Sequence, residues 1–185
     1  MNILKKNTDS NTNSWKGIYL KEEKEKKIKN EKEVKEEIGE EDIIYKVRNL
    51  VKEYLSHKNY KETKLYIKDM KIKNRLYLLV NGIIDFIYDA SDKEIEETII
   101  LFKLLLKNKD LSLKMLKLGI EKSLLGYLDM IIDFPLIKDY WANILNELLI
   151  NKYISLNYIT RITKKNLDDI NYTYITNKLK KKLII

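Results

Sequence analysis

The stretch NRLYLLVNGIIDFIYD (residues 74–89) decides the fold, because its apolar residues fall on several faces of a helix rather than on one stripe. A helix that is hydrophobic almost all round has to be covered by other elements. We therefore predict a central helix over this stretch, packed on more than one side. The apolar positions that recur at helical spacing are Leu76, Leu79, Val80, Ile83, Ile84 and Ile87.

Two helices are predicted before this stretch and one directly after it. The first begins near Glu41 and the second near Tyr60, and both carry one apolar stripe at helical spacing. After the central helix, Ser91 and Glu94 stand three residues apart at the start of the next apolar run. This spacing is typical of a capping box, in which the two residues satisfy free N–H groups at a helix N-terminus. The fourth helix is therefore expected to begin at Ser91.

A fifth helix is predicted from about Leu111, and it must end before Pro135, because a proline disfavours the helical conformation in the residue before it. A sixth helix carries Trp141, and a short seventh covers about 156–164. No ordered segment alternates like a strand, and one proline and five glycines supply few turns for a β architecture. We expect an all-α fold of about six or seven helices, packed as stacked antiparallel hairpins in a HEAT-like manner.

The length of 185 residues suits one domain with tails. Residues 1–41 mix Lys and Glu with few apolar anchors and are expected to form a charged, mostly disordered leader. The helical domain is placed at residues 42–162. Residues 163–185 are expected to be a basic C-terminal extension.

The sequence offers little for catalysis. It contains no cysteine and a single histidine, His57, so neither thiolates nor an imidazole cluster could hold zinc. No glycine-rich phosphate-binding motif occurs. We expect no enzymatic activity, no metal, no cofactor and no small-molecule substrate. With no visible secretory signal or membrane-spanning segment, a cytoplasmic protein is expected, with the nucleus as an alternative.

The net charge of +8 and the pI of about 9.3 suggest nucleic acid as a partner. Abundant Lys, Asn and Ile are also what AT-rich codons produce, so the bulk charge is weak evidence. The residues best placed to contact RNA phosphates are Lys178, Lys180, Lys181 and Lys182. The same cluster could equally be a solubilising end or part of a nuclear-localisation signal.

Two acids interrupt the apolar run SLLGYLDMIIDFP (residues 123–135), which ends in the single proline of the chain. Asp129 and Asp133 lie four residues apart, which places them on one side of a helix with Cβ atoms about 6 Å apart. Near the C-terminus of a helix they would oppose its macrodipole, so they are expected to be solvated or to meet cations. One interpretation is solvated loop acids, and the other is a binding site.

The segment GIEKSLLGYLDMIIDFP (residues 119–135) resembles a characteristic stretch of the MI domain, also written MA-3. A second segment, KEYLSHKNYKETKLYIKDM (residues 52–70), is similar to the opening hairpin of the same family. The resemblance covers about residues 44–160. Ser123 departs from it, because the family commonly has a core leucine there. MI domains occur in eukaryotic initiation factor 4 gamma and in programmed cell death protein 4.

The resemblance implies a right-handed arrangement of HEAT-like hairpins and an adaptor function. It carries the role of contacting the DEAD-box RNA helicase initiation factor 4A onto Asp129 and Asp133, with Pro135 shaping the loop. The implied function is modulation of translation initiation. The alternative is a basic RNA-binding or ribonucleoprotein-assembly protein, splicing or nucleolar, that uses the same helical fold.

Overall fold

The computed structural model describes residues 38–183, with side chains described as far as Lys180. The predicted leader therefore lies outside the described residues, except for its last few positions. Within residues 38–183 every regular element is helical, which confirms the predicted all-α class. The elements are α2 (Glu40–His57), α3 (Tyr60–Asp69), the 3-10 turn η1 (Lys73–Arg75), α4 (Tyr77–Tyr88), α5 (Asp92–Lys107), α6 (Leu113–Leu125), α7 (Tyr127–Asp133), α8 (Ile137–Ile150), α9 (Leu156–Asn166) and α10 (Asp169–Leu183).

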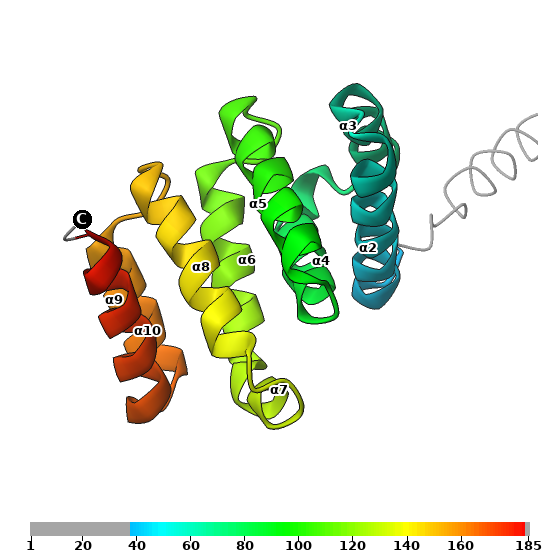
Figure 1. The fold of residues 1–185 in the computed structure, drawn as a ribbon. Coiled ribbons are helices and arrows are strands. Elements are labelled where there is room, and N and C mark those ends of the chain that lie inside the picture. The colour runs from blue at the N-terminus through cyan, green and yellow to red at the C-terminus, as the bar shows by residue number, and fades with distance from the viewer. Residues whose placement is uncertain (1–37, 184–185) are drawn as a thin grey trace, which may run out of the picture. The chain divides into compact units, whose positions relative to one another are not determined.

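The helices form two layers of stacked antiparallel hairpins (Figure 1). One layer contains α2, α4, α6 and α9, each in contact with the next. The other contains α5, α8 and α10 in contact along the stack, with α3 paired to α2 at one end. The central position predicted for residues 74–89 is confirmed, because α4 contacts α2, α5, α6 and α8. This is the HEAT-like stacking that the sequence predicts.

Two glycines set the spacing of the first layer. A Cβ atom added at Gly82 of α4 would lie 2.5 Å from the Cβ of Val47 in α2. A Cβ atom added at Gly119 of α6 would lie 2.4 Å from the Cβ of Val80 in α4. The three helices therefore approach one another at positions where only glycine fits.

Ser123 of α6, which stands where the family commonly has a leucine, also lies in this layer. Its hydroxyl lies 2.6 Å from the side-chain amide of Asn81, which donates a second hydrogen bond of 3.0 Å to the carbonyl of Gly119. Because Asn81 satisfies both groups, α4 and α6 pack here through hydrogen bonds instead of through a leucine.

The described residues contain nine α-helices, where six or seven were predicted. The predicted fifth helix divides at Gly126 into α6 and α7. The other additional helix is α10, which lies in the segment predicted as an extension. The capping box at the start of α5 is confirmed, because the Glu94 carboxylate accepts a hydrogen bond of 2.9 Å from the backbone N–H of Ser91.

Helix α10 packs against α8 and α9 as part of the stack. Its residues Asn171, Ile175 and Leu179 are buried and repeat every four positions, so they form one inward-facing stripe. The lysines and tyrosines between them face outward or lie at the edges of the contact. In the structure, the segment from Asp169 to Leu183 therefore contributes to the core.

Candidate functional site

Helix α7 forms a short bend between α6 and α8, at one edge of the stack (Figure 1). Its inner side is held by Tyr127, which is fully buried, and by the half-buried Met130 and Ile131. Phe134, directly after the helix, stacks on Tyr88 of α4 with ring centroids 6.4 Å apart. These contacts fix which side of α7 faces away from the core.

The outer side of α7 combines two carboxylates with apolar side chains. Asp129 and Asp133 are both exposed, and neither forms an ion pair or a side-chain hydrogen bond within the part of the chain that the structure describes. Pro135 is exposed just beyond them. The exposed apolar residues beside the carboxylates are Leu125 (71 % exposed), Leu128 (42 %), Ile132 (79 %) and Leu136 (58 %). We call these four residues together with Asp129 and Asp133 the α7 face.

The break at Gly126 changes the electrostatic environment expected for the first carboxylate. Because α7 begins at Tyr127, Asp129 stands in the first turn of a new helix and not near the end of a long one. A negative charge there is favoured by the helix dipole, whereas Asp133 at the last position is opposed by it. The expectation that both acids oppose the dipole is therefore wrong for Asp129. Both lie on one helix, as the spacing predicts.

Helix α10 contacts α7 on its buried side. The Tyr127 hydroxyl donates a buried hydrogen bond of 3.2 Å to the Oδ1 atom of Asn171. Asn171 is oriented in turn by Asp168, whose carboxylate accepts hydrogen bonds of 3.0 Å from its amide and 2.7 Å from its backbone N–H. Sequence reasoning missed these positioning residues, because the tyrosine and the asparagine are 44 positions apart.

A second link joins α10 to the start of α8. Asp139 accepts a hydrogen bond of 2.6 Å from the Tyr174 hydroxyl and pairs with the ammonium group of Lys178. Burial by itself raises the pKa of the Asp139 carboxyl, but the hydrogen bonds from Lys178 and Tyr174 outweigh it, so its pKa lies below the usual 3.8. The carboxylate is thus held ionised at the base of the α7–α8 connection.

A groove of about 380 Å³ runs from the α7 face toward α2 and α4. Leu125, Gly126 and Met130 line its α7 end, and Glu40 and Asp85 lie on its far side. The groove thus joins the α7 face to residues of α2 and α4.

The model of the MA3 domain matches residues 44–155, which is more than half of the chain. The chain belongs to the MA3 domain family. This is the same domain as the MI domain of eukaryotic initiation factor 4 gamma and programmed cell death protein 4, so the resemblance seen in the sequence is confirmed. No curated protein matches the sequence.

MA3 domains are helical, HEAT-like modules that mediate protein interactions in translation-related proteins, and the family is not a catalytic one. The α7 face of this MA3 domain has the composition of such a contact surface. Interface cores are apolar and are surrounded by polar groups, and here exposed leucine and isoleucine side chains lie beside two carboxylates.

Of the four C-terminal lysines predicted as possible RNA contacts, the structure describes the side chains of Lys178 and Lys180. Lys178 is half-buried, paired with Asp139, and lies 5.6 Å from the centre of the Tyr174 ring. Lys180 is exposed, while the side chains of Lys181 and Lys182 lie outside the described residues. Lys178 is thus engaged within the domain, and RNA contact by these lysines stays a prediction.

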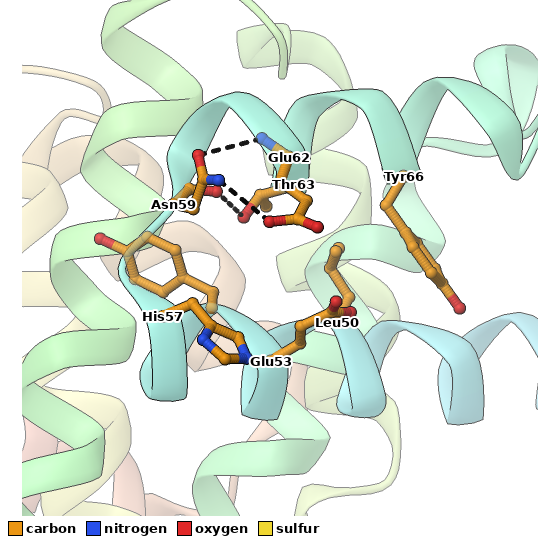
Figure 2. Close-up of a pocket in the computed structure, with 8 residues that line it drawn as sticks. Leu50, Glu53, His57, Asn59, Glu62, Thr63 and Tyr66 are labelled. Carbon is orange, nitrogen blue, oxygen red and sulfur yellow. Dashed lines mark hydrogen bonds between the residues drawn. The ribbon is translucent and has the colours of Figure 1, made fainter.

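His57 lies at the α2–α3 turn of the MA3 domain, beside a small pocket (Figure 2). The pocket has a volume of about 10 Å³, about that of one water molecule. Asn59 on its rim caps α3 by accepting from the backbone N–H of Glu62 at 3.4 Å. The pocket therefore belongs to a structural turn. Across residues 38–183, no cluster of acids and histidines could hold a metal ion, and no helix is long and apolar enough to cross a bilayer.

Proposed function

We propose that this MA3 protein is a cytoplasmic adaptor that docks on the DEAD-box RNA helicase initiation factor 4A through its α7 face and thereby modulates translation initiation. The observation that carries the proposal is the pair Asp129 and Asp133. Both carboxylates are exposed on one side of a helix, without an ion-pair partner among the described residues, next to exposed apolar side chains.

The chemistry of the α7 face fits a partner that carries arginines around an apolar patch. A guanidinium group can donate two parallel hydrogen bonds to one carboxylate, and such charge-assisted bonds are among the strongest in proteins. Ile132 and Leu125 lie beside the carboxylates and are largely exposed, so a partner that covers them removes apolar area from water. The carboxylates then select the partner and its orientation, while the apolar side chains supply the dry centre.

Two contacts within the domain orient the α7 face. Tyr127 anchors α7 to α10, and the stacked Phe134 anchors the following loop to α4. Binding then orders only a few exposed side chains, so less conformational entropy opposes association than for a flexible loop.

The proposal is tested by capture of purified initiation factor 4A on the immobilised full chain. We expect the variant Asp129→Lys/Asp133→Lys to weaken capture by about 30-fold or more, since removing one partner of a desolvated charge pair costs about 2–5 kcal/mol. Because both side chains are exposed, its circular dichroism spectrum should match that of the native chain.

A matched control is available on α5. Asp92 and Glu96 are exposed, lie four residues apart, and Asp92 occupies the first turn of its helix as Asp129 does. The variant Asp92→Lys/Glu96→Lys makes the same change of charge and should retain capture. Equal capture by the native chain and by the folded Asp129→Lys/Asp133→Lys variant refutes the assignment of the site.

A further inference from the structure

A second surface lies at the edge of the stack opposite α7, where α3, η1 and the turn after α5 meet (Figure 1). It is a groove of about 790 Å³. We call it the α3 groove. Neither the proposed helicase contact nor the family match gives this groove a function. Nine of its ten lining residues come from the continuous stretch 61–76 and the tenth is Asp110, so α3, η1 and the turn after α5 create it together.

The rim of the α3 groove is strongly basic. Five exposed lysines line it, and the single acid among the lining residues is Asp110. Asp110 is already engaged, because it pairs with Lys64 at 2.8 Å and accepts a hydrogen bond of 2.7 Å from the Tyr60 hydroxyl. The other rim lysines form no ion pair within residues 38–180 and so leave their positive charge uncompensated: Lys61, Lys68, Lys71 and Lys73.

The floor of the groove is aliphatic. Leu65 projects from α3 and is 61 % exposed, although it stands between lysines on the same helix. Ile67, Ile72 and Leu76 complete the floor and are buried or half-buried. The groove thus offers an apolar strip between rows of ammonium groups.

This arrangement favours a peptide over a nucleic acid. Single-stranded nucleic acids gain much of their affinity from stacking bases on aromatic rings, and no aromatic side chain lines this groove. An amphipathic helix instead places apolar side chains, at intervals of three and four residues, into an apolar groove. Acidic residues beside those anchors would meet the rim lysines, because complementary charge raises the association rate and fixes the orientation of the partner.

We propose that the α3 groove binds an acidic amphipathic helix of a partner protein, with leucine-like anchors on the aliphatic floor and carboxylates against Lys61, Lys68, Lys71 and Lys73. The α3 groove shares no residue with the α7 face, and it is proposed independently of the helicase site.

The test begins with phage-displayed random 16-residue peptides, selected on the full chain. We expect enriched sequences with Asp or Glu flanking apolar residues at helical spacing. The affinity of a fluorescein-labelled selected peptide is then measured by fluorescence anisotropy. Lys68→Glu/Lys71→Glu and, separately, Leu65→Ser should each weaken binding by about tenfold or more, because the first reverses rim charge and the second removes the exposed anchor point.

The control variant Lys164→Glu/Lys165→Glu makes the same charge change in the last turn of α9, where both lysines are exposed, and should leave affinity unchanged. Asp129→Lys/Asp133→Lys should also leave it unchanged, which separates this surface from the proposed helicase site. Selected peptides without acidic residues, or undiminished binding to Lys68→Glu/Lys71→Glu, would overturn the proposal.

Two further outcomes would assign a different ligand to the α3 groove. A labelled 15-nucleotide oligouridine that binds and is lost with Lys68→Glu/Lys71→Glu, while no peptide depends on these lysines, would overturn the proposal in favour of RNA. Removal of residues 1–37 could also raise the peptide affinity by about tenfold or more. This result would show that these residues occupy the groove, and it would overturn the proposal that a partner protein binds there.

Discussion

Replacing Gly119 by alanine should destabilise the domain, although alanine is the better helix-forming residue. The added Cβ atom would lie 2.4 Å from the Cβ of Val80, 2.7 Å from its Cγ1 and 2.9 Å from the backbone carbonyl of Tyr77. Carbon atoms in contact normally lie about 3.5–4.0 Å apart, so α4 and α6 would have to separate by roughly 1 Å. Neither the β-branched valine nor the carbonyl can move aside without its helix.

The magnitude follows from two opposing terms. Overpacking a core by one methyl group costs typically about 1–3 kcal/mol and occasionally more, and contacts with backbone and a β-branched residue place this site at or above the upper end. Alanine recovers about 1 kcal/mol through its higher helix propensity. We expect Gly119→Ala to lower the free energy of unfolding by about 2 kcal/mol, which corresponds to a fall in Tm of roughly 4–8 °C for a domain of this size.

Gly126→Ala provides the matched comparison seven residues further on. A Cβ atom at Gly126 meets nothing within 4 Å, and its φ of −90° suits any residue. Alanine there should raise stability by roughly 0.4–1 kcal/mol, because it restricts the unfolded chain. Urea unfolding of both variants, followed by circular dichroism and by the fluorescence of the buried Trp141, measures the difference. A Gly119→Ala variant as stable as the native chain would refute the close approach of α4 and α6.

Two further predictions concern α10. Since the pKa of Asp139 is lowered on folding, its contribution to stability is complete above the usual value of 3.8 and is lost as the pH falls below it. Asp139→Asn should therefore lower Tm at pH 7, and the difference from the native chain should close as the pH falls below 3.8; a difference independent of pH contradicts this. Ending the chain before Asp169 removes Ile175 and Leu179 from the core, each worth about 1.5–3 kcal/mol of burial, and uncovers Tyr127. This loss approaches the whole stability of a typical domain, so rapid digestion by trypsin at 25 °C is expected, and native resistance would contradict it.

The sequence predicts most of the fold because the first six predicted helices carry apolar stripes at helical spacing. The stretch at residues 74–89, with apolar residues on several faces, identifies α4 as central, and Ser91 with Glu94 identifies the start of α5. The break at Gly126 could not be found from periodicity, because the apolar run continues across it. A glycine within a helical pattern is compatible with an uninterrupted helix, and only the packing of Tyr127 shows that the chain turns there.

Helix α10 is harder to recognise because one narrow stripe carries its burial. Asn171, Ile175 and Leu179 supply that stripe, and one of the three is polar. Their spacing of four residues is the signal that was available. For the candidate site, the sequence correctly places Asp129 and Asp133 on one side of a helix. Their exposure and the apolar side chains beside them required the structure, since both depend on how α7 is anchored.

The hydrogen bond between Tyr127 and Asn171 has a consequence for how the MA3 module is delimited. The stretch by which the family is recognised ends at residue 155, whereas the asparagine that anchors α7 stands 16 positions beyond it. A fragment cut at residue 155 would keep every residue of α7 and lose Asn171, which orients it. If such a fragment failed to bind a partner, the cause would be the loss of the residue that orients α7, and not the loss of a residue that contacts the partner.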